Sequence, residues 1–153
     1  GLCTRYGSLD NALQQVHSEI ICFQETKLVN PGALRSDVCI SKDFFSFFSI
    51  CNHSNRHDKA YSGTATFVLK NVPVLRAQQG LTGRHTTSKQ SQSNDDTIIC
   101  IEPHEVNMTD DELQLLDAEG RCVITDHGNF ILFNVYAPNA HPCYMVSTSR
   151  VDS

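Results

Sequence analysis

The sequence lacks any run of about eighteen apolar residues, the length that a membrane-spanning helix needs, so we expect no membrane partner. Its start, GLCTRYGSLD, lacks the basic-then-apolar order of a signal peptide and an initiator Met, so we expect a fragment or a processed piece. Positive charge is also scarce, because 12 basic against 17 acidic residues leave a net charge of −5. This sign disfavours binding to nucleic acid by phosphate neutralisation alone, although acidic groups that hold a cation can still face a phosphate.

Cysteine, in contrast, is abundant, with 7 in 153 residues. The number is odd and no CxxC pair occurs, while Cys22, Cys100 and Cys122 lie in apolar runs. This pattern predicts buried, reduced thiols of a cytosolic or nuclear protein. The string from Cys51 through His53 to His57 offers three zinc-type ligands, but it lacks the second half that a structural zinc site needs, so we do not favour zinc.

The hydrophobic pattern predicts an α/β or α+β protein. Residues 8–17 place apolar side chains on one helical face behind a capping Ser8, and residues 20–23 follow as a strand expected to be buried on both faces. Residues 109–112 form a capping box for a helix that should end near Gly120. Further strands are expected at residues 44–50, 61–69 and 97–101, and as a hairpin of residues 122–125 and 130–136.

Two polar side chains stand where predicted strands end. Glu25 closely follows residues 20–23, where a carboxylate suits a hard cation such as Mg²⁺, although a solvated or capping glutamate is the simpler interpretation. Tyr136 ends residues 130–136, where its hydroxyl can donate to a charged phosphate oxygen or simply belong to the rim of the core. No GxSxG, P-loop or HExxH string is present, so composition and spacing leave the function open.

Three further residues are candidate contacts for a phosphate backbone. Arg121 follows the Gly120 helix stop, and arginine is the preferred phosphate contact even though most exposed arginines are merely solvated. Asn139 offers an amide just beyond Tyr136. Tyr61 places an aromatic ring before a strand, where a core or rim role is the simpler interpretation.

Four local strings carry a family resemblance. Residues 18–27, SEIICFQETK, resemble the D-I-(L/V)-C-L-Q-E-T-K strand of the exonuclease III-like AP endonucleases, in the endonuclease/exonuclease/phosphatase superfamily. Residues 61–63 are similar to that family's Y-S-G, residues 119–121 to its E-G-R, and residues 134–140 to its (N/A)-x-Y-x-P-N-A string, in family order. Residues 108–121 also resemble the longer connection of one branch of the family.

The resemblance implies a partial four-layer α/β sandwich, about one sheet plus helices. Residues 1–140 would be the amino-terminal half of that domain, with a flexible Ser- and Gln-rich insertion at residues 78–96 and a divergent, disordered tail at residues 141–153. It also implies roles for the site residues: Glu25 as a ligand of Mg²⁺, with Mn²⁺ as the alternative ion, and Tyr136 as the catalytic tyrosine that hydrogen-bonds the scissile phosphate. The implied DNA-binding residues are Asn139, Arg121 and Tyr61.

The implied activity is hydrolysis of the DNA backbone at abasic sites in base excision repair, with 3′–5′ exonuclease and 3′-phosphodiesterase activity. The implied partner is DNA with abasic sites or 3′-blocked ends. The implied location is the nucleus, with mitochondrion and cytoplasm as alternatives. The family's G-D-x-N and S-D-H strings have no counterpart here, so we expect this chain alone to be inactive. The alternatives are a non-catalytic truncated product or incomplete gene model, and a phosphatase or phospholipase of the same superfamily.

Overall fold

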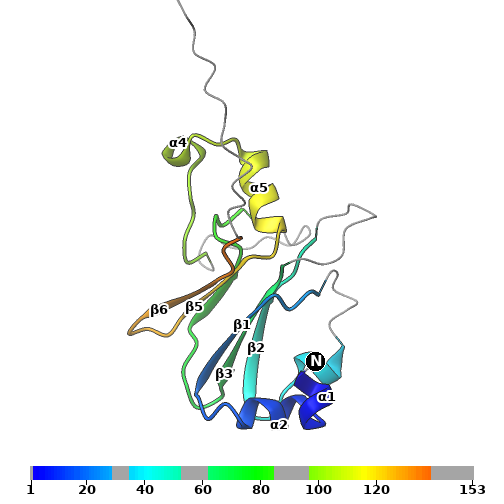
Figure 1. The fold of residues 1–153 in the computed structure, drawn as a ribbon. Helices are drawn as coiled ribbons and strands as arrows, with labels where there is room; N and C mark the ends of the chain where they lie inside the picture. The colour runs from blue at the N-terminus through cyan, green and yellow to red at the C-terminus, as the bar shows by residue number, and fades with distance from the viewer. Residues whose placement is uncertain (1, 29–34, 53–61, 85–96, 139–153) are drawn as a thin grey trace, which may run out of the picture.

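Two small sheets make up the centre of the molecule. The computed structural model describes residues 2–28, 35–52, 62–84 and 97–138. Their strands form two three-stranded antiparallel sheets with the orders β1-β3-β2 and β4-β5-β6. The sheets pack against each other, with α1 and α2 at one end of the molecule and α4 and α5 at the other (Figure 1). The α/β class is confirmed, and the strands are divided over two facing sheets rather than gathered in about one.

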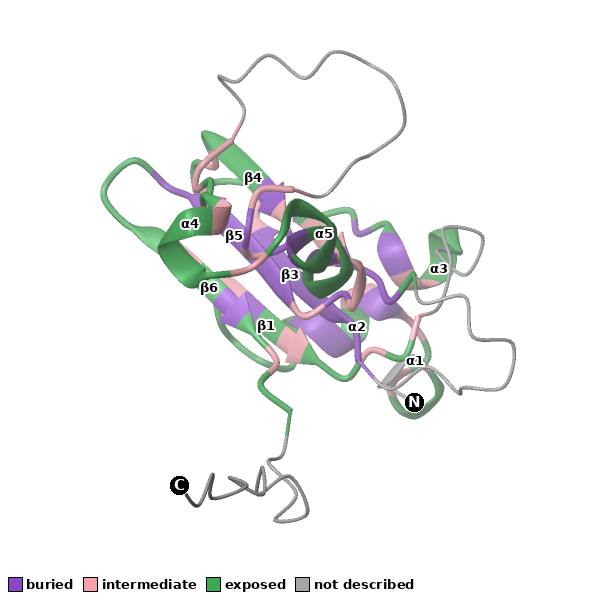
Figure 2. Ribbon diagram, turned by 90° about the horizontal axis from the view of Figure 1, so that it is seen from above, coloured by how far each residue is buried: buried purple, intermediate pink, exposed green. Residues whose placement is uncertain are grey.

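The first sheet contains β1 (Ile20–Gln24), β2 (Phe44–Ser49) and β3 (Thr64–Leu69). The central strand, β3, is buried along almost its whole length (Figure 2). The prediction that residues 20–23 are buried on both faces is wrong, because β1 lies at the edge of an antiparallel sheet and exposes Cys22.

One face of this sheet holds the main apolar cluster. The N-terminal helices are α1 (Leu2–Tyr6) and α2 (Leu9–Gln14), and α3 (Ser36–Cys39) follows β1 in the chain. Ser8 caps α2 as predicted, because its hydroxyl accepts the N–H of Asn11 at 3.2 Å. The buried side chains of the cluster, which come from α2 and all three strands, are Leu9, Leu13, Ile21, Phe44, Ala65 and Phe67.

The second sheet contains β4 (Arg76–Gln79), β5 (Cys122–Asp126) and β6 (Ile131–Val135). The predicted hairpin is confirmed as β5 and β6, with every residue of the central β5 buried. Residues 97–101 form no strand, contrary to the prediction. Instead of pairing with a strand, this segment is hydrogen-bonded by the side chain of Gln78. Its Oε1 accepts the N–H groups of Ile98 and Ile99 at 2.8 and 2.9 Å.

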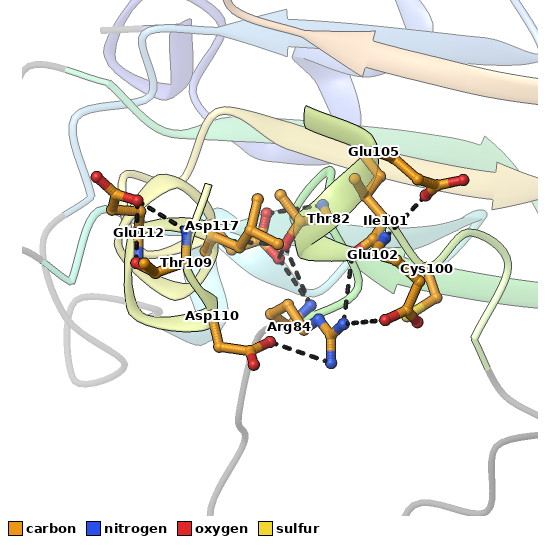
Figure 3. Close-up of polar contacts among 11 residues, drawn as sticks. Thr82, Arg84, Cys100, Ile101, Glu102, Glu105, Thr109, Asp110, Glu112 and Asp117 are labelled. Carbon is orange, nitrogen blue, oxygen red and sulfur yellow. Dashed lines mark hydrogen bonds and ion pairs between the residues drawn. The ribbon is translucent and has the colours of Figure 1, made fainter. Parts of the chain in front are cut away.

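The predicted flexible insertion at residues 78–96 is wrong in its first part. Gln78 and Gln79 belong to β4, and Thr82 is fully buried. The loop after β4 closes around the carboxylate of Asp117 on α5 (Asp110–Ala118), which accepts four hydrogen bonds from residues 81–84 (Figure 3). Residues 85–96 and the predicted tail at 141–153 lie outside the described residues.

Polar contacts hold the N-terminal ends of α4 and α5. The capping box predicted at Thr109 and Glu112 is present at the start of α5. Arg84 pairs with Glu102, which precedes α4 (Pro103–Val106), at 3.0 Å and with Asp110 of α5 at 3.4 Å (Figure 3). This arginine therefore ties the loop after β4 to the starts of both helices. No helix in the described part of the chain is long and apolar enough to cross a membrane.

The cysteines agree only partly with prediction. The described cysteines are free thiols, as expected: Cys22, Cys39, Cys51, Cys100 and Cys122. Cys122 is buried, but Cys22 and Cys100 are exposed, which corrects their predicted burial. His53 and His57 lie outside the described residues, and within the described ranges no group of three or more His, Cys, Asp or Glu side chains is placed to hold a metal ion.

Candidate active site

Glu25 and Tyr136, 111 residues apart in the chain, meet at one end of the two sheets. Glu25 is the first residue after β1, and Tyr136 is the first residue after β6. The Tyr136 hydroxyl donates a hydrogen bond to Oε1 of Glu25 at 2.9 Å. The structure therefore brings together the two residues that the sequence singles out at strand ends.

The backbone around Glu25 turns sharply away from β1. Both Glu25 and Lys27 adopt left-handed conformations, with φ of 54° and 58°, which cost about 1–3 kcal/mol each for residues other than glycine. Two backbone hydrogen bonds hold this turn against β3, from Thr26 N to Gly63 O at 3.0 Å and from Lys27 N to Ser62 O at 2.9 Å. Strain of this kind, held by surrounding bonds, is common where a side chain must be presented in a fixed direction.

Gly63 is the residue that lets the turn approach so closely. Its φ is 98°, and a Cβ added there would lie 2.4 Å from Oγ1 of Thr26. A larger residue would force the Thr26 side chain to move, and the φ of 98° would strain any residue other than glycine. This explains the glycine of the Y-S-G string in physical terms.

Arg121 completes the group from the other side of Tyr136. Its guanidinium lies over the Tyr136 ring, 5.3 Å from the ring centroid, and its backbone oxygen accepts the Tyr136 N–H at 2.8 Å. Its side chain is only 17% exposed and also pairs with Glu119. Ser62 donates its hydroxyl proton to the Glu119 carbonyl, so the E-G-R and Y-S-G strings are in direct contact.

The surroundings of Tyr136 favour the protonated form of its hydroxyl, as its raised pKa shows. The hydrogen bond to the Glu25 carboxylate raises the pKa of Tyr136, and partial burial and the Glu25 charge add to this, while Arg121 acts in the opposite direction. The phenol is therefore a hydrogen-bond donor at neutral pH. Lys27 Nζ lies 3.8 Å from Oε2 of Glu25, but both side chains are at least half exposed, so this pair contributes little.

The arrangement combines a donor and a positive charge for an anion with a carboxylate for a cation. Glu25 has a half-exposed side chain, and its oxygens are hard ligands of the kind that Mg²⁺ prefers. Mg²⁺ often binds one or two carboxylates and keeps several waters, so the single carboxylate found here fits that ion. Beside it, the Tyr136 hydroxyl is a donor of the kind that binds an oxyanion such as a phosphate, and the largely buried Arg121 guanidinium places a positive charge behind the ring.

The predicted site residues have three outcomes. Glu25, Tyr136 and Arg121 are brought together. Tyr61 and Asn139 lie outside the described residues. Sequence reasoning missed the polar side chains that join the strands beneath the site, Gln24 and Asn134. The signal that could have found them is a polar residue at the end of an otherwise apolar strand.

The fold has a solved counterpart, although no protein-family model matches the chain. The structure matches that of the APE2 catalytic domain from Xenopus laevis with a TM-score of 0.66 and 29% sequence identity, covering 90% of this chain and 42% of that one. The fold is therefore an α/β fold of the endonuclease/exonuclease/phosphatase type, as the sequence predicts.

Similarity to curated proteins indicates which branch of the AP endonucleases this chain resembles. The chain is 34% identical over 139 residues to DNA-(apurinic or apyrimidinic site) endonuclease 2 of Homo sapiens, and 31% identical over 144 residues to the Bos taurus protein. These matches cover 85% and 88% of this chain but only 24% and 26% of the relatives, so the chain spans about a quarter of their length. It is a partial AP endonuclease 2-like protein, the branch whose longer connection residues 108–121 resemble.

Proposed function

We propose that this chain supplies part of a metal-dependent nuclease site that hydrolyses DNA phosphodiester bonds in base excision repair. The proposed activities are cleavage at abasic sites, 3′–5′ exonuclease and 3′-phosphodiesterase activity, on DNA with abasic sites or 3′-blocked ends in the nucleus. The observation that carries the proposal is the 2.9 Å contact between Tyr136 and Glu25. The names of the relatives, which are AP-site endonucleases, support the substrate class.

Each residue has a distinct proposed task. Glu25 would hold Mg²⁺ or Mn²⁺, and a cation held there would supply neutralisation of the negative charge of the phosphate. With DNA bound, Tyr136 turns its one hydroxyl proton from the Glu25 carboxylate to a phosphate oxygen, and that bond strengthens as negative charge develops there. Arg121 adds a fixed positive charge behind the tyrosine ring. Asn139 and Tyr61 are proposed DNA contacts on the strength of their strings alone.

A terbium experiment tests the cation site on the chain itself. The sequence contains no tryptophan, so emission from bound Tb³⁺ is sensitised by tyrosine, and Tyr136 is adjacent to the proposed ligand. We expect sensitised emission that Mg²⁺ displaces and that Glu25→Gln and Tyr136→Phe abolish. Glu19→Gln, an exposed glutamate just before β1, should leave it intact. Equal emission from wild type and Glu25→Gln would refute the metal assignment.

Catalysis by the 153-residue chain is a separate question. Its sequence contains neither a G-D-x-N nor an S-D-H string, the strings that carry the water-activating groups of the family it resembles. We propose that this chain alone does not nick DNA and that non-catalytic binding is its alternative role. Nicking of an abasic duplex with Mg²⁺ tests this, since EDTA-sensitive cleavage that Glu25→Ala abolishes would overturn it. Hydrolysis of inositol phosphates or sphingomyelin, but not of abasic DNA, would favour the phosphatase or phospholipase alternative.

A further inference from the structure

Asn134 is a buried amide at the interface between the two sheets. It lies on β6 and is only 3% exposed. Its Nδ2 donates toward Phe23 O of β1 at 3.3 Å, Ala65 O of β3 at 3.0 Å and Thr66 Oγ1 of β3 at 3.2 Å. One side chain of the second sheet thus reaches two strands of the first.

The bridge stands directly beneath the candidate site. Phe23 is two residues before Glu25, and Asn134 is two residues before Tyr136. The contact therefore joins β1 and β6 at the ends that carry the carboxylate and the phenol. Gln24 adds a more exposed bond beside it, from its Nε2 to Val135 O at 3.0 Å.

Ordinary packing does not account for an amide at this place. Oδ1 of Asn134 is buried and has no hydrogen-bond partner in the described part of the chain, an arrangement that opposes folding. Leu132, two residues earlier on the same face of β6, is apolar, as an interface between sheets favours. Apolar contact is non-directional, whereas the bonds to Phe23 O of β1 and Ala65 O of β3 are directional and restrict how β6 can slide along both strands.

We propose that Asn134 is a positioning residue whose amide sets the distance between Glu25 and Tyr136. A shift of β6 by two residues would move Tyr136 by about 6–7 Å and break its contact with Glu25. The consequence for catalysis rests on the proposed nuclease function, but the positioning itself does not. Its effect on the contact can therefore be measured without metal or DNA.

The first test uses tyrosine fluorescence in the metal-free chain. The sequence has 4 tyrosines and no tryptophan, so a chain with Tyr6, Tyr61 and Tyr144 changed to Phe reports on Tyr136 alone. A phenol that hydrogen-bonds a carboxylate has quenched emission, so Glu25→Gln should raise the emission of this chain. Asn134→Ala should raise it to a similar level.

The matched control separates positioning from stability. Leu132→Ala removes a half-buried side chain from the same face of β6, farther from the site, so it lowers the melting temperature without reaching Glu25. We expect Leu132→Ala to leave the emission of Tyr136 unchanged. An Asn134→Ala chain that is folded by circular dichroism yet keeps wild-type emission would overturn the proposal, as would an equal rise in Leu132→Ala.

A milder variant covers the case in which Asn134→Ala does not fold. Asn134→Ser keeps one donor, so it should give emission between those of wild type and Glu25→Gln. Wild-type emission from a folded Asn134→Ser chain would also overturn the proposal.

Terbium binding supplies the second readout. Residues that orient a metal ligand typically change metal affinity by about 10- to 100-fold, and we expect a loss of that size in Asn134→Ala but not in Leu132→Ala. If Tb³⁺ binds nowhere while the fluorescence of Asn134→Ala rises as expected, the proposed metal site fails and the positioning role stands. If Tb³⁺ binds through Glu25 with unchanged affinity and emission in Asn134→Ala, the positioning role fails and the metal site stands.

Discussion

Removal of the Asp117 carboxylate should be among the most damaging single changes to this fold. Asp117 is 1% exposed on α5. Its Oδ1 accepts the N–H groups of Leu81 and Thr82 at 2.7 and 2.9 Å, and its Oδ2 accepts the Thr82 hydroxyl and the Arg84 N–H at 2.7 and 3.1 Å. One side chain thus accepts the hydrogen bonds of four donors in residues 81–84, the loop after β4.

The magnitude follows from the donors that Asp117→Ala leaves behind. Each buried, unsatisfied donor costs about 1–3 kcal/mol, but water entry and loop relaxation recover part of that sum. Three backbone N–H groups and one hydroxyl lose their acceptor, so we take about 3–5 kcal/mol, near the low end of that sum, as the expected loss. For a chain of this size, that loss lowers the melting temperature by about 6–20 °C.

Thermal unfolding followed by circular dichroism is the appropriate assay, with Asp110→Ala as the matched control. Asp110 lies on the same helix and pairs with the same loop through Arg84, but it is 61% exposed, so its loss should cost less than about 1 kcal/mol. Asp117→Asn should fall between the two, because its amide nitrogen would face the Arg84 N–H. A shift in Asp117→Ala no larger than that in Asp110→Ala would refute the reasoning.

Two further predictions concern titratable groups of the second sheet. The Gly128 N–H, and then the Arg76 guanidinium, hold the pKa of Asp126 below its ordinary value. Its stabilisation is therefore present above about pH 4 and is lost as the pH falls through the folded-state pKa. The difference in melting temperature between wild type and Asp126→Asn should shrink from about pH 5 to about pH 2, and a constant difference would contradict this. Burial, and then a neighbouring carboxylate, raises the pKa of Cys122 to about 12. At about pH 8 iodoacetamide should therefore modify exposed Cys100 and spare Cys122 until denaturant is added, whereas equal labelling of the folded chain would contradict the assignment.

The features that could be predicted from sequence are those whose chemistry is local. The Ser8 cap and the Thr109 capping box each join residues three apart, so their strings contain both partners. The hairpin around Gly128 is local in the same sense. Such signals predict where elements begin and end without information on how the elements pack.

The features that sequence reasoning missed depend on distant partners. Residues 78–84 look like a flexible insertion because they are polar, yet Asp117, some 35 residues later, supplies their hydrogen-bond partner. The edge position of β1 also follows from pairing with β3, whose register no local string reveals. Polar composition predicts a mobile loop only when no buried group elsewhere satisfies its donors.

The candidate site lies between these two cases. Glu25 and Tyr136 could each be recognised, because each is a polar residue placed at the end of an apolar strand. Their 2.9 Å contact could not, because it requires β6 to lie against β1 across an interface between two sheets. Burial of apolar side chains stabilises the contact between the two sheets. It does little to fix the position of one sheet along the other, since hydrophobic contact has no preferred direction. Alignment must come from directional groups at the interface, and in the described part of the chain the buried amide of Asn134 contacts both β1 and β3 next to the site. A polar residue inside a sheet interface therefore indicates where two distant strand ends must be held together.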